Sequence, residues 1–370
     1  MKYLLSLVCF FLLLSFSSHS QTNLNALRGS YSYIPDSLTA STSSIASYIR
    51  SRYQTDQERL EAIYLWVTSN LKYDTDSSNQ INLGENQQAK ITEALRRRRG
   101  VCENFAAIFN DITTKTGIRS YVVQGYTKQL GSIDKTGHSW VAVYIHNTWF
   151  FCDPTWDVST GNNAKYFLIE PDEFIETHMP FDPLWQLKND PISHEDFYIG
   201  NSRGSGYFNF KDSLEAYTQM DSLKKYKTIA TRIERAGIKN NLLKNNLGYN
   251  KMQIEIINQD RDAELYNSAI ELSNKAAAIL NKFLVYRNER FLPEKKDEEI
   301  RNSLSGINAL LSLAISKLDK IDKSEATFAI SSEPVRERIK GLYKRTAEQL
   351  SFINHYLQSP VANRASLFYK

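Results

Sequence analysis

Residues 138–156 read HSWVAVYIHNTWFFCDPTW, and this stretch decides the fold of the first half of the chain. Two runs rich in Val, Ile, Tyr, Phe and Trp, at 138–145 and 148–153, have the composition of β-strands. The pair His146-Asn147 separates them and suits a two-residue hairpin turn, because Asn tolerates the left-handed conformation that such turns need. The stretch therefore predicts two antiparallel strands.

The length of this turn determines which side chains share a face of the sheet. If Ile145 pairs with Thr148, counting outward places Trp140 opposite Asp153. His138 lies on the same face as Trp140, so Asp153 is its diagonal neighbour at about 7–8 Å, which an imidazole and a carboxylate can bridge by a hydrogen bond. A three-residue turn would reverse the faces and separate the pair.

The cysteine of the hairpin, Cys152, falls on the face opposite to Asp153. We therefore interpret Cys152 as a buried small hydrophobic residue and expect no disulfide between Cys102 and Cys152.

Cys102 stands at the start of a second predicted element, an amphipathic helix that ends near Gly117. The apolar residues that follow the cysteine share one helical face: Phe105, Ile108, Phe109 and Ile112. A helix N-terminus favours a thiolate over a thiol, because its amides and its dipole attract negative charge. The four arginines at 96–99 either form a solvated helix end or add to this field and attract an anionic substrate.

Three residues therefore fit nucleophilic catalysis: Cys102 as the nucleophile, His138 as the base and Asp153 as the carboxylate that orients the base. Asp157 competes with Asp153 for the third place, although it lies beyond Pro154, where strand pairing should fail. We interpret His178 as a structural residue, with a role in the site as the alternative.

The order of the motifs resembles that of the transglutaminase-like superfamily. The motifs that carry this resemblance are Gly100-Val101-Cys102-Glu103, Gly125-Tyr126-Thr127-Lys128, Gly137-His138-Ser139-Trp140 and Trp149-Phe150-Phe151-Cys152-Asp153-Pro154-Thr155-Trp156. A further run resembles the kyphoscoliosis-peptidase branch: Thr177-His178-Met179-Pro180, followed by Asp182, Trp185 and Gln186. The resemblance covers roughly residues 45–200.

The resemblance implies an α+β, papain-like core, in which the helix with Cys102 packs on an antiparallel sheet. It also implies a Cys102-His138-Asp153 triad that transfers acyl groups through a thioester, with the Cys102 amide in the oxyanion hole. Asn104 and Ser139 depart from residues common in relatives, Gly and Ala respectively, and these differences bear on substrate shape rather than on the triad.

The segments around this core predict the rest of the domain organisation. We expect an extended lead-in at 21–50, followed by a helix that opens with a capping box at Thr55 and Glu58. The transglutaminase-like domain then occupies 51–205. Three glycines and two serines between 200 and 206 indicate a hinge.

An all-α helical bundle is expected over 206–370. Between Leu265 and Tyr286, and again between Ile300 and Ile321, apolar residues recur at alternating intervals of four and three residues. This spacing is typical of the seam between packed helices. Pro293 separates these two runs, and a further helix starts at Ser332. We expect the stripes to form an intramolecular core, with a protein partner or self-association as the alternative.

The first twenty residues predict a signal peptide, because Lys2 precedes an apolar run from Leu4 to Phe16. After this run, Ser18 and Ser20 place small residues at the two positions that a signal peptidase recognises. We expect cleavage before Gln21, export to the periplasm or the medium, and no stable membrane insertion afterwards. A net charge of only +4, from 45 basic and 41 acidic residues, argues against a nucleic-acid binder.

The sequence thus predicts an exported thiol enzyme that acts on amide bonds of peptides or proteins and needs neither a metal nor an organic cofactor. The alternative is a catalytically silent transglutaminase-like module that binds or scaffolds proteins together with its helical bundle. Hydrolysis and cross-linking share the same acylation step, so the residues do not separate them.

Overall fold

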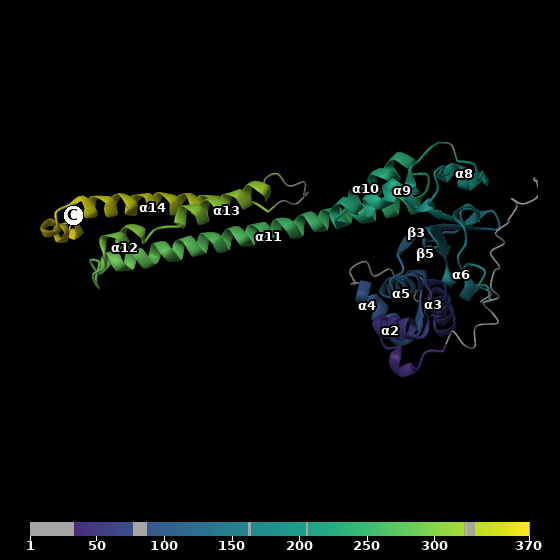
Figure 1. Ribbon diagram of the computed structural model, residues 1–370. Helices are drawn as coiled ribbons and strands as arrows, with labels where there is room; N and C mark the ends of the chain where they lie inside the picture. Colours follow the sequence, from purple (N-terminus) through teal and green to yellow (C-terminus); the bar gives the residue numbers. More distant parts are fainter. Residues whose placement is uncertain are drawn as a thin grey trace, which may run out of the picture. The chain divides into compact units, whose positions relative to one another are not determined.

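A computed structural model describes residues 33–76, 87–161, 164–204, 206–321, 323 and 330–369. The predicted signal peptide and the first part of the lead-in lie outside these residues. The chain divides into two compact units (Figure 1): one comprises the residues up to Met220 together with Thr231–Leu247, and the other comprises Asp221–Ala230 and Gly248–Lys370. The first unit therefore continues past the 200–206 segment at which we placed the boundary.

The first unit is built on a five-stranded sheet in which β4, β3, β5 and β6 are neighbours in that order and β7 pairs with β3. The strands are β3 (Ser120–Gln129), β4 (Ser132–Ile133), β5 (His138–Ile145), β6 (Thr148–Cys152) and β7 (His178–Pro180). All of these pairs are antiparallel. A separate parallel pair joins β1 (Lys72–Tyr73) to β2 (Arg99–Gly100).

The predicted hairpin is confirmed, including its register. Ile145 pairs with Thr148 and Val141 with Cys152, as a two-residue turn requires. His146 and Asn147 have φ values of 53° and 60°, which are the left-handed conformations of that turn.

Helices cover one face of the sheet, and in Figure 1 they lie together beside β3 and β5. They are α2 (Thr42–Arg52), α3 (Asp56–Asn70), α4 (Gln87–Arg97) and α5 (Cys102–Lys115). The capping box at Thr55 and Glu58 opens α3 as predicted. The alternate side chains Val141, Val143 and Cys152 belong to the core on this face, whereas Trp140 and Phe151 belong to a second core on the other.

The prediction of an extended lead-in is wrong for residues 42–50, which lie in α2. Ser41 caps that helix by accepting from the Ser44 amide at 3.1 Å, and Ile45 and Ile49 are buried one helical turn apart. The abundance of Ser, Thr and Tyr concealed this helical spacing.

Short elements complete the first unit. They are η1 (Asp36–Leu38), α6 (Pro154–Ser159), α7 (Pro171–Phe174), η2 (Pro183–Gln186), α8 (His194–Ile199) and α9 (Phe210–Thr218). Two longer helices contribute to both units, namely α10 (Ser222–Ala236) and α11 (Asn241–Asn288).

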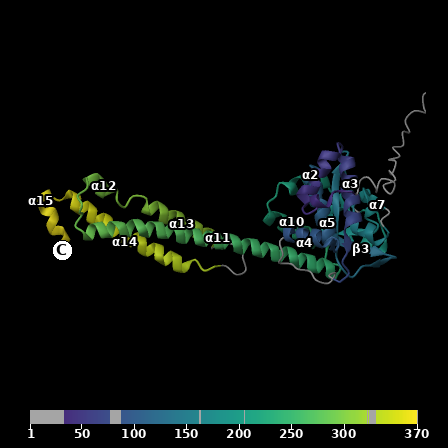
Figure 2. The same cartoon turned by 90° about the horizontal axis from the view of Figure 1, so that it is seen from below.

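The second unit is helical, and α13 and α14 run along α11 in both ribbon views (Figure 2). Its other elements are α12 (Asp297–Asn302), α13 (Ile307–Ile321), α14 (Glu333–Gln358), α15 (Val361–Arg364) and η3 (Ala365–Tyr369). The predicted stripes meet in one buried core. The run from Ile300 to Ile321 is not one helix, because Gly306 adopts a φ of 83° between α12 and α13.

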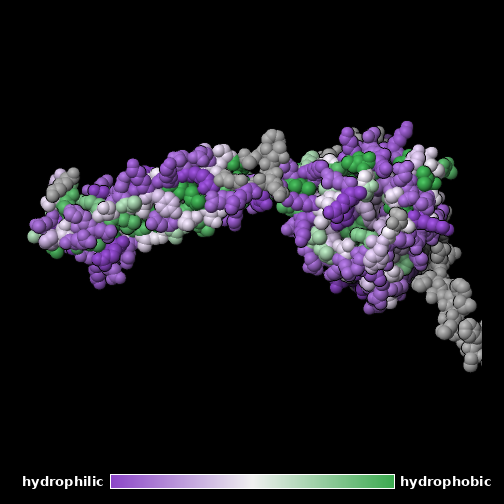
Figure 3. Space-filling model, turned by 90° about the horizontal axis from the view of Figure 1, so that it is seen from above, coloured by the Kyte–Doolittle hydropathy of each residue, from purple (hydrophilic) through white to green (hydrophobic). Residues whose placement is uncertain are grey.

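The surface of the helical unit is mostly hydrophilic on the face seen in Figure 3, as expected when apolar stripes turn inward. Among the helices described here, none has the length and the hydropathy that a bilayer crossing requires.

Candidate active site

Cys102 is the first residue of α5, as the sequence predicts, and its side chain is a partly exposed free thiol. The loop before it is held by the Val101 amide, which donates to Asn104 Oδ1 at 2.9 Å, and by the Asn104 amide, which donates to the Val101 carbonyl at 2.9 Å. A Cβ at Gly100 would come within 2.6 Å of Asn104 Cβ. Asn104 therefore caps the helix, and its departure from the family pattern has a structural use.

His138 begins β5 and donates from Nε2 to Asp153 Oδ2 at 2.6 Å. Burial lowers the pKa of His138, but the charge and hydrogen bond of Asp153 outweigh this effect, and the nearby Cys102 side chain raises the pKa further. The pKa of His138 rises to about 10 as a result. Because Asp153 occupies Nε2, the nitrogen left for Cys102 is Nδ1. The structure thus joins His138 to Asp153 by a direct hydrogen bond and places the Cys102 side chain near enough to the His138 ring to raise its pKa.

Asp153 is fully buried and receives four hydrogen bonds. Its Oδ1 accepts from the amides of Thr155 and Trp156 at 2.9 and 3.1 Å, while Oδ2 accepts from His138 and from His178, the latter at 3.1 Å. Burial raises the pKa of Asp153, but the two histidines outweigh burial and lower it overall. The carboxylate is therefore ionised and fixed at both oxygens.

The prediction that Asp153 ends a strand needs one correction. β6 stops at Cys152, and Asp153 is the N-cap of α6, with Pro154 at the first helical position. Asp is favoured at the N-cap of a helix and Pro at the first helical position, so the pair Asp153-Pro154 could have predicted a helix start here.

His178 is the residue whose position the sequence analysis did not anticipate. It lies on β7, is completely buried, and stacks on Phe174 with ring centroids 3.9 Å apart. β7 reaches the site by pairing with β3, where Gly125 lies opposite Pro180 and Thr127 opposite His178. The motif that contains His178 was noted in the sequence, but its contact with Asp153 depends on this long-range pairing.

The carboxylate of Asp157, the competitor for the third place, has hydrogen-bond partners other than His138. It accepts from the Tyr64 hydroxyl and from the amides of Lys165 and Tyr166, at 2.9 and 3.2 Å for the two amides. Burial raises the pKa of Asp157. The contacts of Asp157 therefore connect α6 to α3 and to the segment that follows α6. The hydrogen bond with His138 is made by Asp153 instead.

The arginines before Cys102 are engaged with groups other than the thiol. Arg97 and Arg99 pair with the buried Asp74 at 2.8 and 3.4 Å, and Arg96 pairs with Glu93 at 2.6 Å. Arg98 lies over the Trp66 ring, 5.1 Å from its centroid. These contacts of the four arginines thus hold β2 and the C-terminal end of α4 in place.

Cys152 is buried in the core on the helical side of the sheet, as its strand position predicts. Burial raises the pKa of its thiol well above the ordinary value. Two aromatic residues lie near the candidate site residues: half-buried Trp156, with its ring 6.2 Å from that of His138, and Tyr73. Burial and the charges of Cys102 and Asp153 raise the pKa of Tyr73.

One group of side chains in the described part of the chain has the composition of a metal site, namely His138, Asp153 and His178, whose donor atoms lie within 4.8 Å of one another. The two Nε2 atoms already contact Asp153 Oδ2 at 2.6 and 3.1 Å. A carboxylate oxygen can only accept, so each of these nitrogens carries a proton rather than a free lone pair. The arrangement fits a hydrogen-bonded network better than metal ligation.

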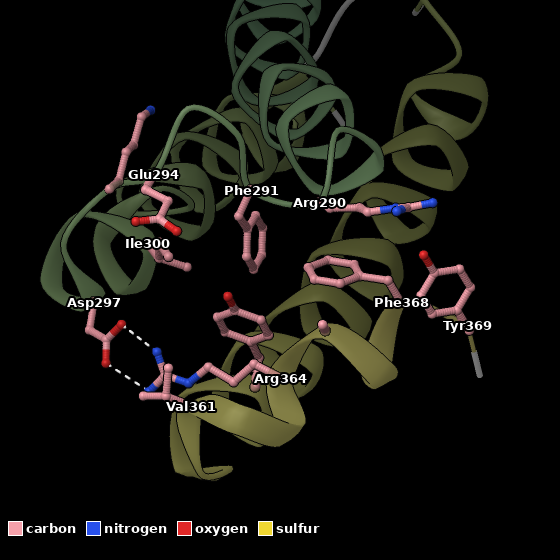
Figure 4. A pocket seen from close by; sticks show the side chains of 12 residues that line it. Arg290, Phe291, Glu294, Asp297, Ile300, Val361, Arg364, Phe368 and Tyr369 are labelled. Carbon is pink, nitrogen blue, oxygen red and sulfur yellow. Dashed lines mark hydrogen bonds and ion pairs between the residues drawn. The ribbon is translucent and has the colours of Figure 1, made fainter.

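A cavity of about 390 Å³ lies elsewhere, in the helical unit (Figure 4). Phe291 and Phe368 point toward its interior, and at its rim Arg364 pairs with Asp297 at 2.8 Å. The residues that line it include neither a cysteine nor a histidine. The chemistry expected of Cys102 therefore has no counterpart there.

Comparison with known proteins gives one family model and several similar proteins. Residues 43–154 match the family model for the transglutaminase-like superfamily. Mouse kyphoscoliosis peptidase is 29% identical over 198 residues, which cover 49% of this chain and 29% of that protein. Hillarin from Drosophila melanogaster is 25% identical over 177 residues, which cover 40% of this chain and 20% of hillarin.

The match thus spans less than a third of each of these curated relatives. Among solved structures, a TGase aligns with a TM-score of 0.24 and 16% identity over 31% of each chain. The predicted resemblance to this superfamily and to the kyphoscoliosis-peptidase branch is confirmed by the family model and the curated relatives, and so is the α+β, papain-like fold class with a helical C-terminal part.

Proposed function

Because residues 43–154 form a transglutaminase-like domain, we propose that this protein is a thiol-dependent acyl-transfer enzyme that acts on amide bonds. The observation that carries the proposal is the hydrogen bond from His138 Nε2 to the buried Asp153 carboxylate at 2.6 Å, with the Cys102 side chain close enough to the ring to raise the pKa of His138. A histidine held between a carboxylate and a thiol is the arrangement that activates a sulfur nucleophile.

In the proposed reaction the Cys102 thiolate attacks the carbonyl carbon of an amide and forms a C–S bond. The amide of Cys102, at the open N-terminus of α5, would donate to the oxyanion. The His138 imidazolium gives its proton to the leaving nitrogen as the C–N bond breaks, and a thioester remains. Water or an amine then attacks the thioester, His138 takes up a proton from it, and the C–S bond breaks.

We propose peptides or proteins as the substrate class, on the resemblance to relatives such as kyphoscoliosis peptidase. The reaction needs no metal or organic cofactor, because sulfur, imidazole and carboxylate supply the nucleophile, the acid and base, and the orienting charge. Cleavage and cross-linking differ only in whether water or an amine accepts the acyl group.

The test incubates the protein with a peptide library and a primary amine, and mass spectrometry follows the peptides. We expect either shortened peptides or peptides that carry the amine, together with a thioester adduct on Cys102. Cys102→Ser should abolish the products, whereas Cys152→Ala should keep them. A folded wild-type protein that yields no product under any condition would favour the alternative, a silent binding module.

Export is a further part of the proposal, and it rests on the apolar N-terminal run. N-terminal sequencing of the protein recovered from outside the cytoplasm should start at Gln21. A chain that still begins at Met1 would contradict it. Association through the helical unit stays a second expectation, and light scattering of the purified protein tests it.

A further inference from the structure

We propose that His178 is a positioning residue of the candidate site, which holds the Asp153 carboxylate so that Asp153 in turn holds His138. This inference rests on the proposed function, because it assigns His178 a part in activating Cys102. His178 is completely buried and is therefore not placed to touch a substrate. It acts through Asp153 Oδ2, which it contacts at 3.1 Å.

The hydrogen bonds around His178 define the protonation of its ring. Asp153 can only accept, so His178 Nε2 carries a proton and donates it. Nδ1 lies 2.8 Å from the Thr177 hydroxyl, which can donate to it. Burial lowers the pKa of His178 to about 4, against the opposing effect of Asp153. His178 is thus a neutral ring with a fixed tautomer.

An aromatic enclosure fixes the plane of this ring. Phe174 stacks on His178 with ring planes 24° apart, and the rings of Trp156 and Trp140 lie 4.3 and 5.3 Å away. A ring packed in this way cannot rotate without displacing its neighbours, because protein interiors are close-packed.

The consequence for Asp153 follows from how its two oxygens are held. The first amides of α6 fix Oδ1, and two imidazoles converge on Oδ2. Without His178, Oδ2 would have His138 as its only donor among the described residues, and the carboxylate could rotate together with it. The His138 ring would then spend less time in the orientation that meets Cys102, so the rate of acylation would fall while substrate binding stayed the same.

Three variants test this inference through the alkylation of Cys102 by iodoacetamide, which needs no substrate. His178→Phe keeps a ring in the enclosure and removes the donor, so alkylation at pH 6 should slow about tenfold. His178→Gln places an amide donor near the position of Nε2 and should restore most of the rate. Thr177→Val changes a residue at the edge of the enclosure and should give a smaller decrease in a folded protein.

Circular dichroism melting accompanies each measurement, so that loss of fold is separated from loss of positioning. A folded His178→Phe variant that reacts like the wild type would overturn the inference, and so would a His178→Gln variant as slow as His178→Phe. If His178→Phe does not fold, the Thr177→Val rate decides, and an unchanged rate counts against the inference. Failure of the proposed function looks different, because the wild type itself would then react slowly at pH 6.

Discussion

Asp153 is held in the candidate site through both its side chain and its backbone. Its backbone is fixed as well as its carboxylate, since the Asp153 amide donates to the Tyr166 carbonyl at 2.9 Å and the Asp153 carbonyl accepts from the Tyr64 hydroxyl at 3.1 Å. The neighbouring carboxylate, Asp157, shares Tyr64 and Tyr166 with the Asp153 backbone, whereas the hydrogen bonds from the two histidines go to the Asp153 carboxylate. This difference in side-chain partners makes the two aspartates a matched pair for experiment.

Replacing Asp153 by Asn should remove the charge that holds His138 and place an NH₂ group against the protonated nitrogens of His138 and His178. We expect catalysis to fall by on the order of 10²–10⁴-fold, as it does when the carboxylate of a catalytic triad becomes an amide. Steady-state kinetics on a peptide substrate gives the measurement. Asp157→Asn should lower the melting temperature and leave the activity per folded molecule nearly unchanged; equal losses in the two variants would contradict these assignments.

At the scale of the element, the sequence predicted the features that local chemistry specifies. The two-residue turn at His146-Asn147 placed His138 and Asp153 on one face, and the spacing of apolar residues placed Cys102 at a helix start. What the sequence left open depends on pairing between distant segments. His178 reaches Asp153 only because β7 pairs with β3, about fifty residues earlier in the chain.

Gly125 is the position in β3 where this pairing is closest. A Cβ there would lie 2.2 Å from the Met179 carbonyl oxygen and 2.4 Å from Trp140. Gly125→Ala should therefore separate β7 from β3 and destabilise the protein by about 1–3 kcal/mol, as overpacking does. Thermal melting measures the effect.

The same variant should slow Cys102 alkylation, because His138 and Pro180 both lie opposite Gly125 in the sheet. Gly137→Ala is the control, since a Cβ at that position meets its nearest neighbour, the Gly125 carbonyl oxygen, at an ordinary 3.6 Å. If both variants melt at the wild-type temperature, the close approach of β7 to β3 is not a constraint.

For the molecule as a whole, the division into two units follows from two kinds of core. The first unit buries aromatic and aliphatic residues on both faces of a sheet, and the second buries a helical stripe. The spacing of apolar residues was enough to predict the buried faces of the C-terminal helices. The break at Gly306 and the helix α2 were not predicted. A single glycine among helix-forming residues is a weak signal, and a Ser-rich composition obscures a short helix.

Stability of the first unit should fall as the pH drops from about 6.5 to 4. His178 and His194 are buried, and burial lowers the pKa of each to about 4, below the ordinary value of 6.5. The unfolded state binds more protons than the folded state in this window, so acid favours unfolding. Urea unfolding at pH 7.5 and 4.5 tests this.

The pKa of His138 shifts in the opposite direction, so its effect on stability has the opposite dependence on pH. Its pKa is raised to about 10 in the folded state, so its contribution to stability is complete below pH 6.5 and is lost as the pH rises through 10. Taken together, the three histidines should make the protein most stable near pH 6.5. A protein that becomes more stable between pH 6.5 and 4.5 would contradict the assignment of His178 and His194 as buried neutral rings.

The most direct test of the whole account is the pH dependence of Cys102 alkylation by iodoacetamide in the wild type and in His138→Ala, followed by peptide mass spectrometry. We predict rapid modification of Cys102 at pH 6 in the wild type, slow modification in His138→Ala, and protection of the buried Cys152 in both. An ordinary thiol needs a pH near its pKa of about 8.5 to react. Modification of Cys102 that sets in only near that pH, with or without His138, would contradict a thiol activated by the His138–Asp153 pair.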